Sequence, residues 1–303
     1  MFERTRAAAA VAMLPLAMAW AAPVAAQDAG GTPSYVLAPS VGIRQTITDN
    51  LRLTTNNRQS DAVTEVTAGV RASRSGGRLQ GFLNYALTGS VAASHSDDND
   101  VTQALNAFGT AELVDSSMFI DVRGMIAQQA ISAFGTQSNA SSVTNDNRTE
   151  TRSYSVAPYW RGRLMGAADY EVRLDHSATD TGTDAASDAS TTTALARLSG
   201  GNPLGFGRSA DAAEVEADYT AGRRTKDQRV RGVLSYAITP QFNAGLIIGR
   251  EANNYESVET SSHDTAGAQV SWQPSERTML SANYESRFFG HSHAVNFMQR
   301  TGR

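Results

Sequence analysis

Two histidines near the C-terminus have the spacing of a metal-binding pair. His291 and His293 are two residues apart, which on a β-strand places both imidazoles on one face. No third ligand is evident beside them, and two surface histidines are the simpler interpretation. We therefore predict no metal site.

An aspartate beside a histidine suggests acid–base catalysis. Asp175 directly precedes His176, and acid–imidazole pairs of this kind serve proteases and lipases. Adjacent residues of a strand point to opposite faces, so these two side chains cannot act on each other. No convergent Ser/His/Asp set can be assembled from the five histidines of the chain. We predict no catalytic residues and no enzymatic activity.

Two further patterns resemble ligand sites. Two loop segments, one with Asp97, Asp98, Asn99 and Asp100 and the other with Asp180, Asp184 and Asp188, offer the oxygen ligands that calcium prefers, although solvated loops explain them better. The segment 205–210 has the letters of a dinucleotide fingerprint without the strand–helix–strand context that such a site needs. We predict no cofactor.

Composition excludes other chemistry. The chain of 303 residues has no cysteine, so thiol catalysis, cysteine-ligated zinc, iron–sulfur clusters and disulfides are ruled out. Its formal net charge of -4 gives no basic field for a phosphate backbone. Nucleic acid is therefore not an expected partner.

The N-terminus has the pattern of a secretory signal peptide. Arg4 and Arg6 precede an apolar run over residues 7–20, and Val24-Ala25-Ala26 is a small-residue cleavage site. The alternative, a membrane-anchoring helix, is disfavoured because the apolar run is short and Pro23 follows it. We expect residues 1–26 to be removed after Ala26 and residues 27–34 to form a short linker.

From Tyr35 onward, apolar residues recur with a period of two, as in half-buried β-strands. The first clear pair of such segments flanks Ser75-Gly76-Gly77 and predicts a hairpin. Fourteen candidate strands follow from this pattern: 36–47, 65–73, 79–91, 101–113, 118–126, 153–164, 169–175, 191–200, 214–219, 229–238, 242–250, 264–272, 279–287 and 293–299.

The predicted connections alternate in length. Short turns, such as those at Gly76 and Pro240, alternate with longer polar segments, of which residues 130–150 are the longest. Long amphipathic strands, short turns at one end, long loops at the other and a secretory signal are typical of a bacterial outer-membrane β-barrel. We therefore predict an all-β, antiparallel transmembrane barrel over residues 35–303, with the long loops outside the cell. A soluble β-sandwich or a secreted β-solenoid is the alternative, although sandwich strands are usually shorter.

A barrel in lipid must turn its apolar face outward. We expect Leu83, Val172, Leu174, Val215 and Ala217 to face lipid. The predicted lumen-facing residues are the charged ones that alternate with apolar positions: Glu65, Arg71, Asp121, Arg123, Arg161, Arg163, Glu171, Arg173, Glu214, Glu216, Arg229 and Arg231. The predicted interfacial aromatic residues are Tyr85, Tyr154, Trp160, Tyr219, Tyr236 and Trp272.

Four short motifs carry a further signal: Thr48-Asp49-Asn50, Arg74-Ser75-Gly76-Gly77-Arg78-Leu79, Tyr154-Ser155-Val156-Ala157-Pro158-Tyr159-Trp160 and Arg287-Phe288-Phe289-Gly290-His291-Ser292. They resemble the outer-membrane β-barrel family associated with the exosortase and PEP-CTERM sorting system. The resemblance implies a Gram-negative envelope whose genome also encodes exopolysaccharide production. It carries over no catalytic residue. Residues 299–303 depart from the pattern of complete barrels, which usually finish on an aromatic residue.

These features together predict a passive channel or export component in the outer membrane, with the link to a surface polysaccharide coming only from the resemblance. The expected partners are outer-membrane lipid, the barrel assembly machinery, and exopolysaccharide or its export proteins. The alternatives are a structural or adhesive barrel with a closed lumen and, last, a barrel hydrolase. Because alternation is weak over residues 293–299, we also expect an incomplete barrel: further strands beyond Arg303, or a curved sheet with a gap between its first and last strands.

Overall fold

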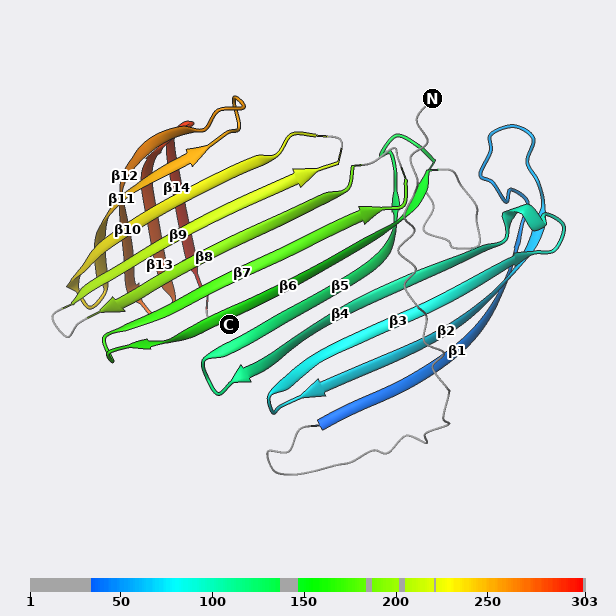
Figure 1. Cartoon of the computed structure of the whole chain (residues 1–303), viewed down its shortest axis with the longest axis horizontal. Coiled ribbons are helices and arrows are strands. Elements are labelled where there is room, and N and C mark those ends of the chain that lie inside the picture. The colour runs from blue at the N-terminus through cyan, green and yellow to red at the C-terminus, as the bar shows by residue number, and fades with distance from the viewer. Residues whose placement is uncertain (1–33, 137–146, 184–186, 202–204, 221, 302–303) are drawn as a thin grey trace, which may run out of the picture.

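The structure, a computed structural model, describes residues 34–136, 147–183, 187–201, 205–220 and 222–301. The predicted signal peptide, its cleavage site and most of the linker lie outside these residues. The described chain forms one antiparallel sheet of fourteen strands that pair in sequence order (Figure 1). The strands are β1 Ser34–Thr48, β2 Asp61–Ser75, β3 Leu79–Ala92, β4 Asp100–Val114, β5 Met118–Ala130, β6 Arg148–Leu164, β7 Ala168–Thr181, β8 Ala189–Gly201, β9 Phe206–Tyr219, β10 Thr225–Thr239, β11 Phe242–Asn253, β12 Ser261–Ser275, β13 Thr278–Arg287 and β14 Gly290–Gln299.

The all-β, antiparallel prediction is confirmed, and every predicted strand coincides with an observed one. The largest difference is in β9, which begins at Phe206 although strong alternation starts only at Glu214. Small residues such as Ala210 and Ala212 occupy the first half of this strand, so its two faces differ little in hydropathy. The only helix among the described residues is a single 3-10 turn at Ser96–Asp98, and no helix there is long and apolar enough to cross a membrane.

Short turns gather at one end of the sheet and longer connections at the other, as predicted. The β2–β3 turn uses Gly76 and Gly77 at φ 84° and 71°, a conformation that glycine adopts without steric cost. One connection departs from the pattern: Phe288 and Phe289 alone join β13 to β14 at the long-loop end. We call the two ends the turn end and the loop end.

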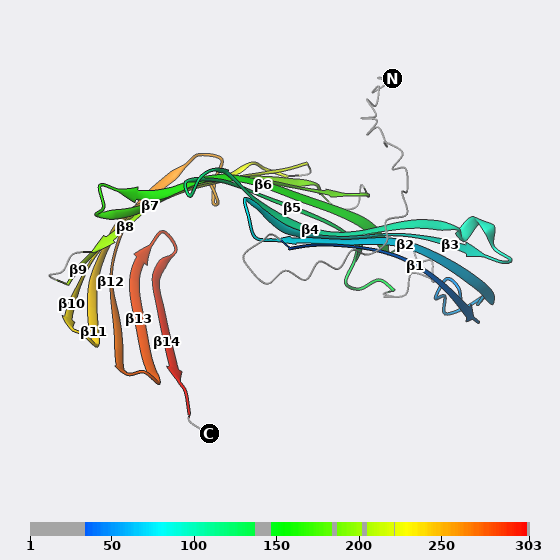
Figure 2. The same ribbon diagram turned by 90° about the horizontal axis from the view of Figure 1, so that it is seen from below.

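The sheet is curved and open among the described residues. Its pairing begins at β1 and ends at β14, and no register joins these two strands. Figure 2 shows β9 to β14 curling away from the flatter part of the sheet. This arrangement agrees with the expected gap between the first and last strands.

The two faces of the sheet differ sharply in burial. Paired residues point to the same side, and the register places Val63, Glu65, Asp121, Ile247 and Glu251 on one face, each less than a tenth exposed. Side chains two or three strands apart meet on this face, which requires them to converge on a concave surface. We call it the inner face and the opposite one the outer face.

Candidate functional site

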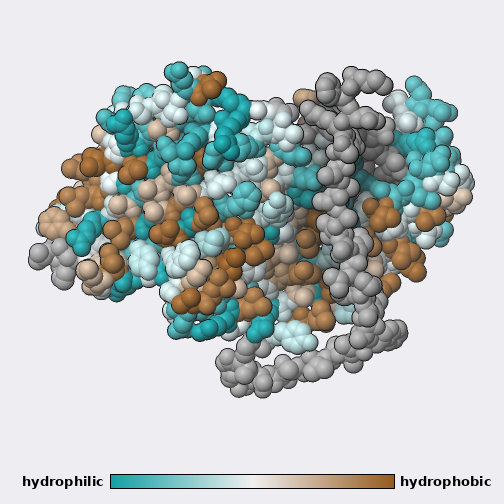
Figure 3. Space-filling view, viewed as in Figure 1, coloured by the Kyte–Doolittle hydropathy of each residue, from teal (hydrophilic) through white to brown (hydrophobic). Residues whose placement is uncertain are grey.

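The outer face has an apolar band across the sheet. Its large side chains stay exposed, with Leu246 at 67%, Ile248 at 69% and Val295 at 72% of their accessible surface. Figure 3 shows hydrophobic side chains gathered across the middle of the visible face, with hydrophilic ones toward the loop end. A face of this kind is stable only against another apolar medium.

Aromatic side chains border the band at the turn end. Register aligns Phe242 of β11 with Trp272 of β12, while Phe206 and Tyr236 are paired with ring centroids 4.7 Å apart. The row on the outer face includes Tyr35, Trp160, Tyr170, Phe206, Tyr236, Phe242, Trp272 and Phe297. Three of the predicted interfacial residues, Trp160, Tyr236 and Trp272, are in it.

Ionised side chains border the band at the loop end. Lys226 Nζ lies 3.0 Å from Glu214 Oε1, and Arg250 Nη1 lies 3.3 Å from Asp264 Oδ1, all on the outer face. Arg224, in the connection before β10, donates to Asp218, and this hydrogen bond with the nearby carboxylate charges raises the pKa of Arg224. These charges are exposed and mutually paired.

The height of the apolar band can be read along β11. Phe242 in the aromatic row and Arg250 in the ionised row are eight residues apart. At about 3.3 Å per residue that is about 26 Å along the strand. At a tilt of about 40° it covers roughly 20 Å of depth, close to the apolar band of about 25 Å in membrane barrels.

The inner face contains ten of the twelve predicted lumen residues: Glu65, Arg71, Asp121, Arg123, Arg161, Arg163, Glu171, Arg173, Arg229 and Arg231. Val172 and Leu174 lie on the outer face, as does Leu83. The structure thus places these polar and apolar residues on opposite faces of the sheet. That the inner face lines a lumen stays a prediction.

The assignment of β9 is wrong. Register places Glu214 and Glu216 on the outer face, opposite Gln228 and Lys226, whereas Val215 and Ala217 point inward. The prediction assumed that charge always marks the lumen. At the loop end this fails, because charges beyond the apolar band reach water from either face. Tyr219 is likewise on the inner face, so it is no part of an outer aromatic row.

On the inner face of β5 to β7, toward the turn end, two arginines enclose two aromatic rings. Phe119 and Tyr159 stack with centroids 5.2 Å apart, Arg161 lies over Phe119 at 4.4 Å, and Arg173 lies over Tyr159 at 4.5 Å. Arg173 also forms an ion pair with Asp121, which accepts a hydrogen bond of 2.7 Å from Thr110. Sequence patterns alone could not place these side chains together, because the stack depends on the register of β5, β6 and β7.

The curled part of the sheet is filled by ion pairs between non-adjacent strands. Arg231 of β10 lies 3.5 Å from Glu285 of β13, and Arg287 donates a hydrogen bond of 2.7 Å to Glu251 of β11. Glu251 is only 2% exposed. A buried carboxylate of this kind needs its partner, so these pairs fix the curvature of β10 to β13.

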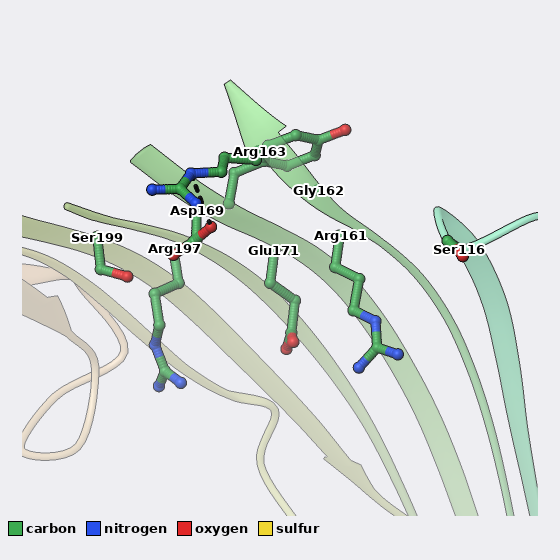
Figure 4. Close-up of a pocket in the computed structure, with 9 residues that line it drawn as sticks. Ser116, Arg161, Gly162, Arg163, Asp169, Glu171, Arg197 and Ser199 are labelled. Atoms are coloured by element: carbon green, nitrogen blue, oxygen red, sulfur yellow. Dashed lines mark ion pairs between the residues drawn. The ribbon is translucent and has the colours of Figure 1, made fainter. Parts of the chain in front are cut away.

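An open groove lies on the inner face near the turn end. Register aligns Arg161, Glu171 and Arg197 in one row across β6, β7 and β8. Figure 4 shows these three side chains projecting to the same side of the ribbon, while Arg163 pairs with Asp169 at 3.8 Å. Positive and negative side chains alternate along this row, so this wall of the groove is hydrophilic and carries charges of both signs.

The residues with possible chemistry do not assemble into a site. Asp175 and His176 are on opposite faces: Asp175 accepts a hydrogen bond from Ser155, and His176 is hydrogen-bonded to Thr192. His291 and His293 share the outer face. Both rings lie near the Tyr284 ring, whose hydroxyl lies 2.9 Å from His291 Nδ1. Among the described residues, no three His, Cys, Asp or Glu side chains are grouped as metal ligands.

Two of the acidic loop residues are held by arginines. Asp98 pairs with Arg52 at 3.0 Å, and Asp100 pairs with Arg148 at 3.5 Å. Asp184 lies outside the described residues. Gly205, in the segment with dinucleotide-like letters, has φ 84° and occupies a turn between two strands.

No family model and no curated protein matches the chain. Among solved structures, it is similar to a bacterial polysaccharide outer membrane secretin, with TM-score 0.42, 10% identity, and 90% of this chain and 100% of that chain covered. It is also similar to an anion-selective porin from Comamonas acidovorans, with TM-score 0.38, 10% identity and coverage of 88% and 95%. A third is OmpTdeltaL8, a loop-deletion mutant of the Vibrio cholerae outer membrane protein OmpT, with TM-score 0.37, 7% identity and coverage of 88% and 96%. Similarity at this level leaves the fold to be defined by the topology and faces of the sheet itself.

Proposed function

We propose that this chain forms the wall of an outer-membrane β-barrel that acts as a passive channel. One observation carries the proposal: the outer face has an apolar band with an aromatic border at the turn end and an ionised border at the loop end. The lipid tails provide the apolar medium for the band, and the hydrated headgroup regions accommodate its aromatic and ionised borders. The charged inner face then lines an aqueous interior.

The channel proposal requires pairing of both sheet edges in the membrane. Each unsatisfied backbone amide or carbonyl in hydrocarbon costs several kcal/mol, so a sheet with free edges does not persist there. The N–H and C=O groups of β1 and β14 that point away from their neighbours must therefore find partners when the protein inserts. Assembly by the barrel assembly machinery is part of this proposal.

The proposed solute class is linked to cell-surface polysaccharide. Support comes from the resemblance of the turn motifs to the exosortase and PEP-CTERM-associated barrels. Under this proposal the barrel serves as an export component, and exopolysaccharide or its export proteins are its partners. The mature chain would reach the membrane after cleavage near Ala26.

Ion conductance tests the channel directly. We expect full-length mature protein in planar bilayers to produce discrete steps of conductance that grow with salt concentration. Steps that persist with the protein omitted would be artefacts of the detergent, so detergent alone is the control. Protein that inserts with its strands intact and conducts no ions contradicts the proposal.

A second candidate, a structural or adhesive barrel with a closed interior, has one observation in its favour. The Arg231–Glu285 and Arg287–Glu251 pairs bridge non-adjacent strands and fill the concave side of β10 to β13. If similar ion pairs closed the whole interior, the protein would insert into the bilayer and conduct no ions. Conductance therefore separates this candidate from the first.

A further inference from the structure

The inner face of β2 to β5 has arginines without acidic partners. Arg71 donates to the Asn84 side chain at 3.1 Å, and the Arg123 guanidinium lies 5.4 Å from the centre of the Phe108 ring. Neither arginine forms an ion pair with a described residue. Asp121, two residues before Arg123, is already paired with Arg173.

Aromatic and amide side chains surround these arginines. Register aligns Arg71, Asn84 and Asn106 in one row across β2, β3 and β4. The next row contains Phe82, Phe108 and Arg123, and the two ring centroids are 6.4 Å apart. Phe82 is 40% exposed, so part of its ring is open to a ligand. We call these six residues the arginine–phenylalanine patch.

We propose that the arginine–phenylalanine patch binds acidic oligosaccharides, meaning chains of sugar rings with carboxylate groups. A guanidinium fork binds a carboxylate with two parallel hydrogen bonds, and the amides of Asn84 and Asn106 provide donors and acceptors for hydroxyl groups. The exposed Phe82 ring offers an apolar platform for the C–H face of a sugar ring.

The dimensions of the patch suit more than one sugar ring. Arg71 in β2 and Arg123 in β5 are separated by three interstrand steps of about 4.8 Å, which gives about 14 Å between their strands. The patch runs across the strands, with Arg71 and Arg123 in neighbouring rows at its two ends, so a linear ligand lies across the strands with carboxylates near both ends. This inference rests on the proposed channel, because the inner face must be accessible to solutes.

Calorimetric titration of the full-length protein in detergent tests the inference, with trigalacturonate as the probe. We expect the parent protein to bind trigalacturonate and to bind neither a neutral malto-oligosaccharide of the same length nor acetate. Arg123→Gln and Arg71→Gln should each weaken binding about tenfold or more, since each removes a charge-assisted bond. Phe82→Leu should also weaken it, because the residue keeps apolar volume and loses the ring.

Arg197→Gln is the matched control. Arg197 is also on the inner face and forms no ion pair with a described residue, yet it lies in β8, away from the patch. Its substitution should leave trigalacturonate binding unchanged. Circular dichroism checks that each variant keeps its β-structure, and Arg123→Lys, which keeps charge and loses the fork, serves if Arg123→Gln misfolds.

Three results would overturn the inference: no binding to the parent, equal binding of the neutral sugar or acetate, or equal loss in the control and patch variants. Conductance measured on the same proteins separates the two proposals. A parent that conducts ions and does not bind trigalacturonate refutes the patch alone. A parent that binds in detergent and never conducts refutes the channel alone.

Discussion

Arginine introduced at the centre of the outer band gives the sharpest test of membrane orientation. Leu246 of β11 is four residues from Phe242 in the aromatic row and four from Arg250 in the ionised row, and 67% of its surface is exposed. Each interval is about 13 Å along the strand, or roughly 10 Å of depth at a tilt of about 40°. Leu246 therefore lies near the proposed bilayer midplane.

The expected cost of Leu246→Arg follows from that depth. Arginine on the lipid face at the midplane of a barrel costs about 2–4 kcal/mol, which lowers the folding equilibrium constant by about 30-fold to 1,000-fold. The assay is reversible unfolding in guanidinium chloride in the presence of lipid vesicles. A soluble sheet would behave differently, because an exposed surface substitution usually changes stability by less than about 0.5 kcal/mol.

Ala252→Arg is the matched control for this measurement. Ala252 is on the same strand and the same face, beyond Arg250 toward the loop end. There the cost should be about 0–1 kcal/mol, because the guanidinium reaches the interface. Equal costs at residues 246 and 252 would refute the proposed band, whatever their size.

In this cysteine-free chain, cysteine at Val172 should resist a water-soluble thiol reagent in bilayers, whereas cysteine at Glu171 or Val215 should react, and the reverse pattern would invert the faces. An epitope tag in the connection between β5 and β6 should bind antibody on intact cells while a tag at Gly76 stays hidden, and exposure of the Gly76 tag would invert the topology. Asp121→Asn should destabilise the protein by about 1–3 kcal/mol, because it leaves Arg173 without its carboxylate. Asp169→Asn, in the exposed pair with Arg163, should cost less than about 1 kcal/mol. Equal losses of stability for the two variants in vesicle refolding would argue against a role for the arginine–aromatic stack.

Strand positions could be predicted from the sequence because alternation depends only on local chemistry. β7 illustrates this: Val172 and Leu174 alternate with Glu171 and Arg173, and the structure places the two sets on opposite faces. Period two reports which residues share a face within one strand. It does not report how one strand is aligned with the next.

The faces of β9 show the limit of that reasoning. Glu214 and Glu216 alternate as cleanly as Glu171 and Arg173, yet the register across β8 places them on the outer face. Depth along the strand decides the outcome, since Glu214 lies beyond the apolar band and pairs with Lys226. A charged residue can be assigned to a face from the sequence only when it is known whether the residue lies inside or beyond the apolar band. The border of the band becomes visible only when the register aligns many strands.

The inner face is divided into two regions that differ in how their charges are satisfied. In β10 to β13, buried Glu251 and Glu285 hold Arg287 and Arg231, so these side chains maintain curvature. In β2 to β5, Arg71 and Arg123 contact an amide and a ring instead of a carboxylate. An arginine that is already paired with a carboxylate gains little free energy by binding a passing anion. An arginine without a carboxylate partner retains most of its attraction for an anion. Solute recognition in the proposed channel therefore belongs to the flatter N-terminal wall, and the curled C-terminal wall sets its shape.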